Sequence, residues 1–176
     1  MSWKKIDEEI LNENPWTTFR RRGFETADGK RGDYFFAQTR GGCAMAIPRL
    51  PDGRFVMVNI YRFLTDEMSI EFPAGGIETD QDPIDGLKME LRQEVGYEAG
   101  SIKLLHIISP SNGVIIDESH IYLCEDLIFV GMDHEWSEDL TAMTVTETEI
   151  DQMVRENKIR CAQTLAAWAI YKSRAV

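Results

Sequence analysis

The chain has 176 residues, of which 43% are hydrophobic and 28% charged, and its formal net charge is −11. This length fits a single domain that can bury a core, and the composition is typical of a soluble globular protein. The negative charge argues against a nucleic acid polymer or an anionic membrane surface as partner. No uncharged apolar run is long enough to span a bilayer. A small phosphorylated ligand is still compatible with the negative net charge, because one bound divalent cation reverses the local electrostatic field.

The cysteine content indicates an intracellular protein. Cys43, Cys124 and Cys161 are odd in number and widely spaced, which argues against a disulfide framework or a zinc site. The first residues contain no apolar signal core. We therefore expect reduced thiols and a cytoplasmic location.

The first 70 residues predict a run of antiparallel strands. The first strand covers residues 17–26 and is closed by the turn signal Asp28-Gly29. Further strand patterns follow at residues 34–40, 43–50 and 54–63. We expect the N-terminal pair of strands to lie outside the main sheet.

Residues 83–95 change to a helical period. Asp82 is a suitable N-cap, Pro83 suits the first helical position, and Gly96 provides the left-handed residue that ends a helix. The apolar stripe of this helix consists of Ile84, Leu87, Leu91 and Val95.

The rest of the chain alternates between strand and helix patterns. Strand patterns occupy residues 102–110 and 118–130, and helical patterns occupy residues 147–156 and 160–173. The order of strands, helix, strands and helices predicts an α+β fold, in which helices cover a mixed sheet.

Glu90 and Glu94 are the strongest candidates for chemistry. Four residues apart on a helix, they project from neighbouring turns on one side. Two carboxylates held this closely repel each other, and a divalent cation between them relieves the repulsion. The loop at residues 73–76 frees backbone carbonyls for the same cation, and Mg²⁺ accepts one or two carboxylates beside water and phosphate. Taken alone, the pair is also compatible with two solvated helix glutamates.

The sequence EFPAGGIETDQDPIDGLKMELRQEVGY at residues 71–97 resembles the Nudix box. That box reads Gly, five residues, Glu, seven residues, Arg-Glu-apolar-any-Glu-Glu-any-Gly-apolar, which places its first glycine at Gly75. The positions that match are Glu90, Leu91, Glu94, Gly96 and Tyr97. The positions that depart from the box are Gln81, Met89 and Gln93.

Segments outside the box resemble the ADP-ribose pyrophosphatases of the same family. The strand that carries Arg62 is similar to one whose arginine contacts substrate, and Pro110 matches a proline that follows the box. The resemblance implies a Nudix-type α/β/α sandwich with a mixed sheet. It also implies an N-terminal antiparallel strand element at residues 1–40, which forms a homodimer, and a Nudix hydrolase domain at residues 41–176.

The implied reaction is hydrolysis of the diphosphate in a nucleoside diphosphate derivative, such as ADP-ribose or a nucleotide sugar, to a nucleoside monophosphate and a phosphorylated product. The implied cofactor is Mg²⁺, with Mn²⁺ as a substitute. The Ala74 carbonyl, Glu90 and Glu94 are its implied ligands, and through the metal both glutamates take part in catalysis. Gln93 stands where many relatives carry a further metal-binding glutamate.

Two alternatives to this function stay open. One is a Nudix enzyme that acts on nucleoside triphosphates or dinucleoside polyphosphates. The other is a catalytically weak Nudix domain that senses nucleotides, which the departures at Gln81, Met89 and Gln93 keep open.

Three further roles come from the resemblance. The general base of ADP-ribose pyrophosphatases lies in a loop after the box, and the best positional match is Glu138, followed by Glu135; an acidic surface loop is equally compatible. Trp16 matches an aromatic residue that stacks on the nucleotide base, although packing of its strand against the domain is an alternative. Arg62 matches a phosphate ligand, and an exposed structural arginine is its alternative.

Overall fold

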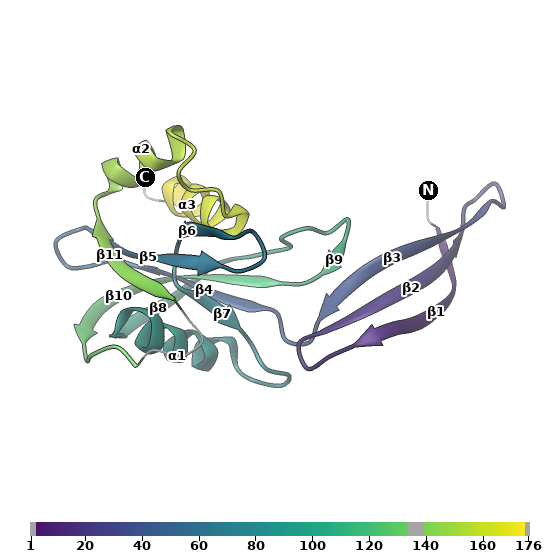
Figure 1. The fold of residues 1–176 in the computed structure, drawn as a ribbon, viewed down its shortest axis with the longest axis horizontal. Helices are drawn as coiled ribbons and strands as arrows, with labels where there is room; N and C mark the ends of the chain where they lie inside the picture. The colour runs from purple at the N-terminus through teal and green to yellow at the C-terminus, as the bar shows by residue number, and fades with distance from the viewer. Residues whose placement is uncertain (1–2, 134–138, 175–176) are drawn as a thin grey trace.

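The computed structural model describes residues 3–133 and 139–174, which form a compact body and a projecting arm (Figure 1). Within these residues the strands are β1 Lys4–Glu13, β2 Thr17–Glu25, β3 Arg31–Thr39, β4 Cys43–Pro48, β5 Phe55–Arg62, β6 Glu67–Glu71, β7 Ala74–Gly76, β8 Tyr97–Ile108, β9 Ile115–Ile116, β10 Ser119–Phe129 and β11 Leu140–Val145. The helices are α1 Pro83–Val95, α2 Glu147–Arg155 and α3 Ala162–Arg174.

The arm is a separate sheet with the strand order β1-β2-β3-β9. β1, β2 and β3 pair antiparallel, and the short β9 joins β3 in parallel through Ala37 and Ile115. The arm extends away from the body (Figure 1), as expected for an N-terminal element outside the main sheet. Sequence patterns missed β1 because nearly all of its side chains are exposed, so that it carries no apolar alternation.

Ion pairs link β1 to β2 in the arm. Glu8 accepts hydrogen bonds from Arg20 at 2.8 Å and Arg22 at 2.7 Å, and it also pairs with Lys5 at 2.7 Å. These cations lower the pKa of Glu8 to about 2, with the Lys5 hydrogen bond as the largest cause and those of Arg22 and Arg20 next. The arginines at residues 20–22 therefore form ion pairs with acidic residues of the arm itself.

The body contains two sheets, with the orders β7-β4-β10-β8 and β11-β5-β6. β4 runs parallel to β10, with Cys43 opposite Ser119, while the other pairs are antiparallel, so the first sheet is mixed. Beyond the N-terminal element, the strands expected as one antiparallel run do not form one sheet. β3, β4 and β5 follow one another in the chain but belong to three different sheets.

Helices cover both sides of the body sheets, with α1 on one side and α2 and α3 on the other (Figure 1). The alternation of side chains along a strand explains this layering. Met45 and Ile47 of β4 belong to the cluster that includes residues of α3, whereas Ala44 and Ala46 belong to the cluster under α1. The body is therefore the expected α/β/α sandwich.

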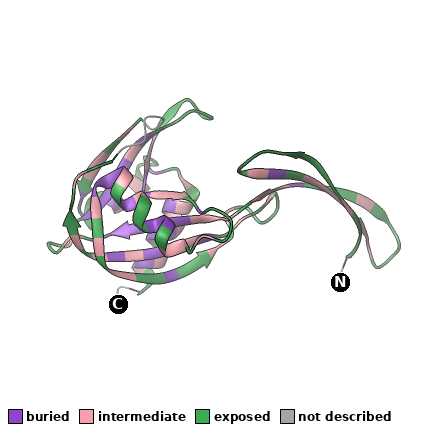
Figure 2. Cartoon of the chain, turned by 90° about the horizontal axis from the view of Figure 1, so that it is seen from below, coloured by how far each residue is buried: buried purple, intermediate pink, exposed green. Residues whose placement is uncertain are grey.

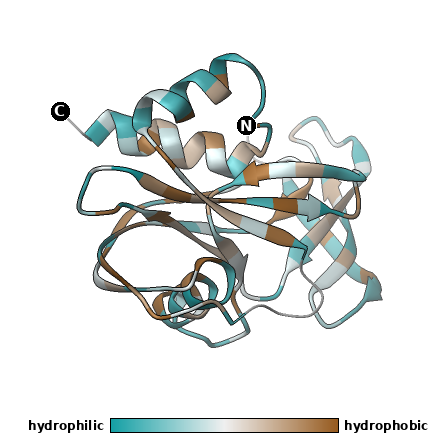
Figure 3. Ribbon diagram, turned by 60° about the vertical axis from the view of Figure 1, so that its left-hand side comes forward, coloured by the Kyte–Doolittle hydropathy of each residue, from teal (hydrophilic) through white to brown (hydrophobic). Residues whose placement is uncertain are grey.

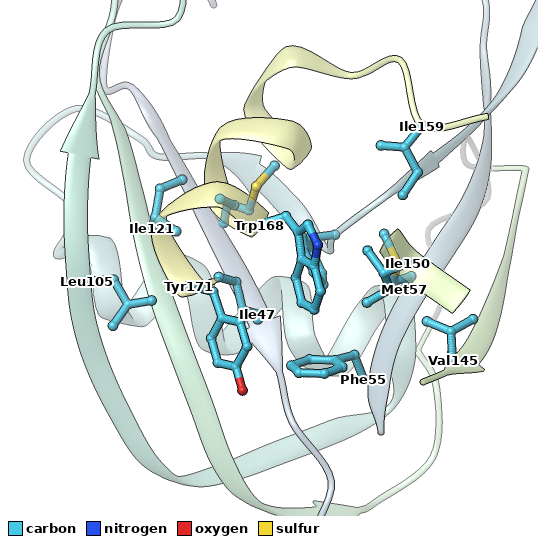
Figure 4. Packing of buried hydrophobic residues seen from close by; sticks show 13 residues of the cluster. Ile47, Phe55, Met57, Leu105, Ile121, Val145, Ile150, Ile159, Trp168 and Tyr171 are labelled. Atoms are coloured by element: carbon cyan, nitrogen blue, oxygen red, sulfur yellow. The ribbon is translucent and has the colours of Figure 1, made fainter. Parts of the chain in front are cut away.

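Aromatic residues fill the core on the α3 side (Figure 4). The rings of Phe55 and Trp168 meet edge to face, with centroids 5.2 Å apart. The indole N–H of Trp168 donates to Asp151 of α2 at 2.8 Å, which ties the two C-terminal helices together.

Buried residues concentrate in the body, while much of the arm is exposed (Figure 2). Hydrophobic residues follow the strands of the body, and the helices turn hydrophilic residues outward (Figure 3). Among the described residues, no helix has the length and apolar character needed to cross a membrane.

Helix α1 has the predicted limits and caps. The Asp82 carboxylate accepts a hydrogen bond from the Ile84 N–H at 2.9 Å, and Gly96 ends the helix at φ 75°. Leu87 and Leu91 are fully buried, which fixes the helix on the sheets.

Because Leu87 is fully buried and Met89 is 42% exposed, substitutions at these neighbouring helix positions separate core packing from helix propensity. Leu87→Ala should lower the free energy of unfolding by about 2–5 kcal/mol. Met89→Ala should lower it by less than about 1 kcal/mol. Urea denaturation of both variants measures the difference; equal losses would contradict the packing described for α1.

Candidate active site

The loop before α1 is fixed to the helix by a hydrogen bond between Ala74 and Glu94. β7 lies at the edge of its sheet, with Gly75 opposite Ala44 of β4. The Ala74 N–H donates to Oε2 of Glu94 at 3.0 Å. Because the N–H and C=O of one strand residue point to the same side, the Ala74 carbonyl also faces the open edge of β7.

Glu90 lies against the same loop. A Cβ atom added to Gly75 would lie 1.7 Å from Oε1 of Glu90, so glycine leaves the space that this carboxylate occupies. Glu90 is half-buried and Glu94 is only 2% exposed. The interpretation of both residues as solvated glutamates is therefore wrong for Glu94.

The arrangement brings together the three groups that were expected to bind a metal. Two carboxylates and one backbone carbonyl suit Mg²⁺, which fills its remaining positions with water and substrate oxygens. Among the described residues, no group of three or more His, Cys, Asp and Glu side chains could hold a metal. A metal at this place would therefore depend on the Ala74 carbonyl as well as on Glu90 and Glu94.

Two of the departures from the box have local explanations. Oε1 of Gln81 accepts a hydrogen bond from the Glu78 N–H at 2.9 Å, which stabilises the loop before α1. Met89 is 42% exposed on the outer face of the helix. Asp82, which follows Gln81, caps the helix, which argues against it as a replacement for the glutamate that the box has at position 81. Gln93 is half-buried on α1 beside Glu94.

Arg62 forms a bidentate ion pair with Glu71 of β6. Its Nε donates to Oε1 at 2.9 Å and its Nη2 donates to Oε2 at 2.8 Å. The hydrogen bonds that Arg62 donates to Glu71 raise the pKa of Arg62, and the charges of Glu71 and Glu94 add to the effect. Arg62 is thus held by one carboxylate and lies within electrostatic reach of another, while 45% of its side chain remains exposed.

Sequence patterns missed Glu71, although it directly precedes the loop. It is 6% exposed, and burial alone would raise its pKa. The hydrogen bonds and charge of Arg62 outweigh that cost, so the pKa of Glu71 lies below its ordinary value. A glutamate at the buried end of strand β6 was the available signal, because buried carboxylates are rare unless they are paired.

A cleft of about 770 Å³ opens beside this ion pair. The β5–β6 hairpin and the residues before and at the start of α3 form its walls, and its polar lining includes Arg62, Glu71, Lys158, Arg160 and Gln163. This volume lies in the range of small-molecule sites.

The half-buried thiol of Cys43 lies on β4, beside Ser119 of β10. Burial raises the pKa of Cys43 to about 12, and the charges of Asp117, Glu90 and Glu94 add to this effect. Its strand partner Ser119 accepts a hydrogen bond from Gln163 at 2.6 Å. Ser119, which lies opposite Cys43, is thus bound to a residue that lines the cleft.

Trp16 lies in the turn between β1 and β2, where the arm joins the body. Its carbonyl accepts from the Arg40 N–H at 3.2 Å, and the neighbouring Gly41 packs against the Ile77 carbonyl. The side chain is 76% exposed, so the alternative that Trp16 packs a strand against the domain is wrong. Glu138 and Glu135, the candidates for the general base, lie outside the described residues.

The fold is shared with a solved structure described as ADP compounds hydrolase. The TM-score is 0.85 at 17% sequence identity, and the match covers 98% of this chain and 94% of that one. No family model matches the chain.

Three curated relatives resemble the sequence. A CMP-5'-(N-acetyl-N-hydroxy-3-aminopropyl)phosphonate hydrolase of Streptomyces rubellomurinus is 23% identical, over 90% of this chain and 76% of the relative. A methanol dehydrogenase activator of Bacillus methanolicus is 28% identical, and an ADP-ribose pyrophosphatase of Bacillus subtilis is 26% identical. Each of the latter two matches covers 72% of this chain and 69% of the relative.

The box residues, the fold and these relatives together support the resemblance to the Nudix hydrolases. The ADP-ribose pyrophosphatase among these relatives supports the resemblance to that group.

Proposed function

We propose that the chain hydrolyses the diphosphate of a nucleoside diphosphate derivative, such as ADP-ribose or a nucleotide sugar, to a nucleoside monophosphate and a phosphorylated product. The observation that carries this proposal is the packing of Glu90 and Glu94 against the loop at Ala74 and Gly75. The names of the hydrolase relatives, which include an ADP-ribose pyrophosphatase, support this substrate class.

The Ala74 carbonyl, Glu90 and Glu94 are the residues that would hold Mg²⁺, with Mn²⁺ as its substitute. When bound, the metal neutralises phosphate charge and lowers the pKa of a water molecule. The N–H of Ala74 keeps the Glu94 carboxylate oriented. Gln93 offers an amide oxygen without charge, so it adds less to the site than the glutamate found in many relatives. Glu138, or Glu135 in its place, is the proposed general base.

Arg62 is the proposed phosphate ligand, and Trp16 the proposed surface for stacking on the nucleobase. The positions of Arg62 at the cleft and of the exposed Trp16 at the base of the arm support these roles. We assign residues 1–40 to a dimer-forming element and residues 41–176 to the hydrolase domain of a cytoplasmic homodimer. Exposed apolar side chains on the arm, Ile10, Phe19 and Phe35, support the dimer.

The direct test is product formation from a panel of ADP-ribose, nucleotide sugars, nucleoside triphosphates and dinucleoside polyphosphates with Mg²⁺ or Mn²⁺. We expect a nucleoside monophosphate from at least one diphosphate derivative. Glu94→Gln should lower this turnover by about 100-fold or more, because the amide oxygen can still accept the Ala74 N–H but carries no charge. Glu98→Gln, at a glutamate with a 62% exposed side chain, is the matched control and should retain activity.

The same panel separates the alternatives. Pyrophosphate release from triphosphates without turnover of ADP-ribose would replace the proposed substrate class. Saturable nucleotide binding with no product from any compound would identify a sensor domain and contradict the proposed enzyme.

Two neighbouring glycines test the position of Glu90. A Cβ atom at Gly75 would displace the Glu90 carboxylate, whereas one at Gly76 would meet no atom within 4 Å. Gly75→Ala should therefore weaken Mn²⁺ binding, measured by electron paramagnetic resonance, by about 10-fold or more. Gly76→Ala should bind Mn²⁺ like the wild type. Equal Mn²⁺ affinities for the two variants would exclude Glu90 as a ligand in this position.

A further inference from the structure

Glu71 is a buried carboxylate that the expected metal site does not use. Both of its oxygens accept hydrogen bonds from Arg62, and the side chains of Ser69 and Cys161 also help to lower its pKa. A carboxylate that is 6% exposed needs such partners, because burial removes its hydration. The ion pair accounts for the burial of Glu71, but it also fixes the geometry of Arg62.

The backbone around Glu71 is held on both sides. The next residue, Phe72, donates its N–H to the buried Oγ1 of Thr164 at 3.2 Å, and the Pro73 carbonyl accepts from the Ala46 N–H at 2.9 Å. The chain then reaches Ala74, whose N–H is bound by Glu94. A short and well-fixed segment therefore connects Glu71 to the loop that faces the carboxylates of α1.

We propose that Glu71 is a positioning residue, which fixes the Arg62 guanidinium so that it meets a substrate phosphate in register with Glu90 and Glu94. This inference rests on the proposed function. The guanidinium has five N–H donors, and the pair with Glu71 uses two of them. The remaining donors can bind a phosphate. An arginine that is already oriented loses less conformational freedom when substrate binds.

Two other roles for Glu71 lead to different results. As a further metal ligand that compensates for Gln93, Glu71 would control metal affinity. As a purely structural ion pair, it would control stability, and its loss would leave the substrate affinity of the folded protein unchanged. The position of Arg62 at the wall of the cleft favours the positioning role.

The test is a double-mutant cycle of Glu71→Gln and Arg62→Ala, with Glu125→Gln as control because Glu125 forms another ion pair, with Arg49, on a different strand. Calorimetry gives the affinity for ADP, steady-state kinetics give kcat and KM for ADP-ribose, and electron paramagnetic resonance gives the affinity for Mn²⁺. Thermal unfolding reports whether each variant is folded. Glu71→Asp, which keeps the charge but shortens the side chain, replaces Glu71→Gln if the latter does not fold.

We expect Glu71→Gln and Arg62→Ala each to weaken ADP binding and to raise KM by about 10-fold. The double variant should be no weaker than Arg62→Ala alone, and the Mn²⁺ affinity should not change. Additive effects, a loss of Mn²⁺ affinity in Glu71→Gln, or ADP affinity at the wild-type level in a folded variant would each overturn the proposal. If the wild type binds ADP but turns over no substrate, the proposed function fails, while ADP binding still decides the role of Glu71.

Discussion

The hydrogen bond from the Ala74 backbone to the buried Glu94 carboxylate is the interaction on which the site depends. It joins an edge strand to helix α1 and thereby sets the loop at Gly75 against Glu90. The burial of Leu87 and Leu91 fixes the helix on the sheets, so that its two glutamates have little freedom to move. Core packing therefore determines where the carboxylates of Glu90 and Glu94 lie.

Local chemistry was sufficient to predict the parts of the fold that short-range interactions control. The limits of α1 follow from the Asp82 cap and the left-handed Gly96, and the apolar patterns of β4 and β10 reflect their burial. The assignment of consecutive strands to different sheets was not predictable, because pairing depends on long-range packing. β1 was missed because nearly all of its side chains are exposed, so that no apolar alternation marks it as a strand.

The candidate site was predictable to a similar extent. The spacing of Glu90 and Glu94 placed both on one side of a helix, and the glycine loop was recognised as their neighbour. The pairing of Arg62 with Glu71 was not found, since these residues lie nine positions apart and meet only through the register of β5 and β6. The exposure of Trp16 likewise depends on how the arm meets the body.

The departures from the Nudix box differ in how close they lie to the proposed metal site. Gln81 has a structural role in the loop, and Met89 faces outward, so neither alters the carboxylates of α1. Gln93 remains the change closest to the proposed metal site. Together, the two glutamates and the backbone of Ala74 offer oxygen atoms of the kinds that Mg²⁺ accepts.

Anomalous diffraction from crystals grown with Mn²⁺ tests most directly whether these three groups form one metal site. We expect an anomalous peak in contact with the carboxylates of Glu90 and Glu94 and with the Ala74 carbonyl. Mn²⁺ bound only elsewhere on the chain, with no peak between these oxygens, would contradict it.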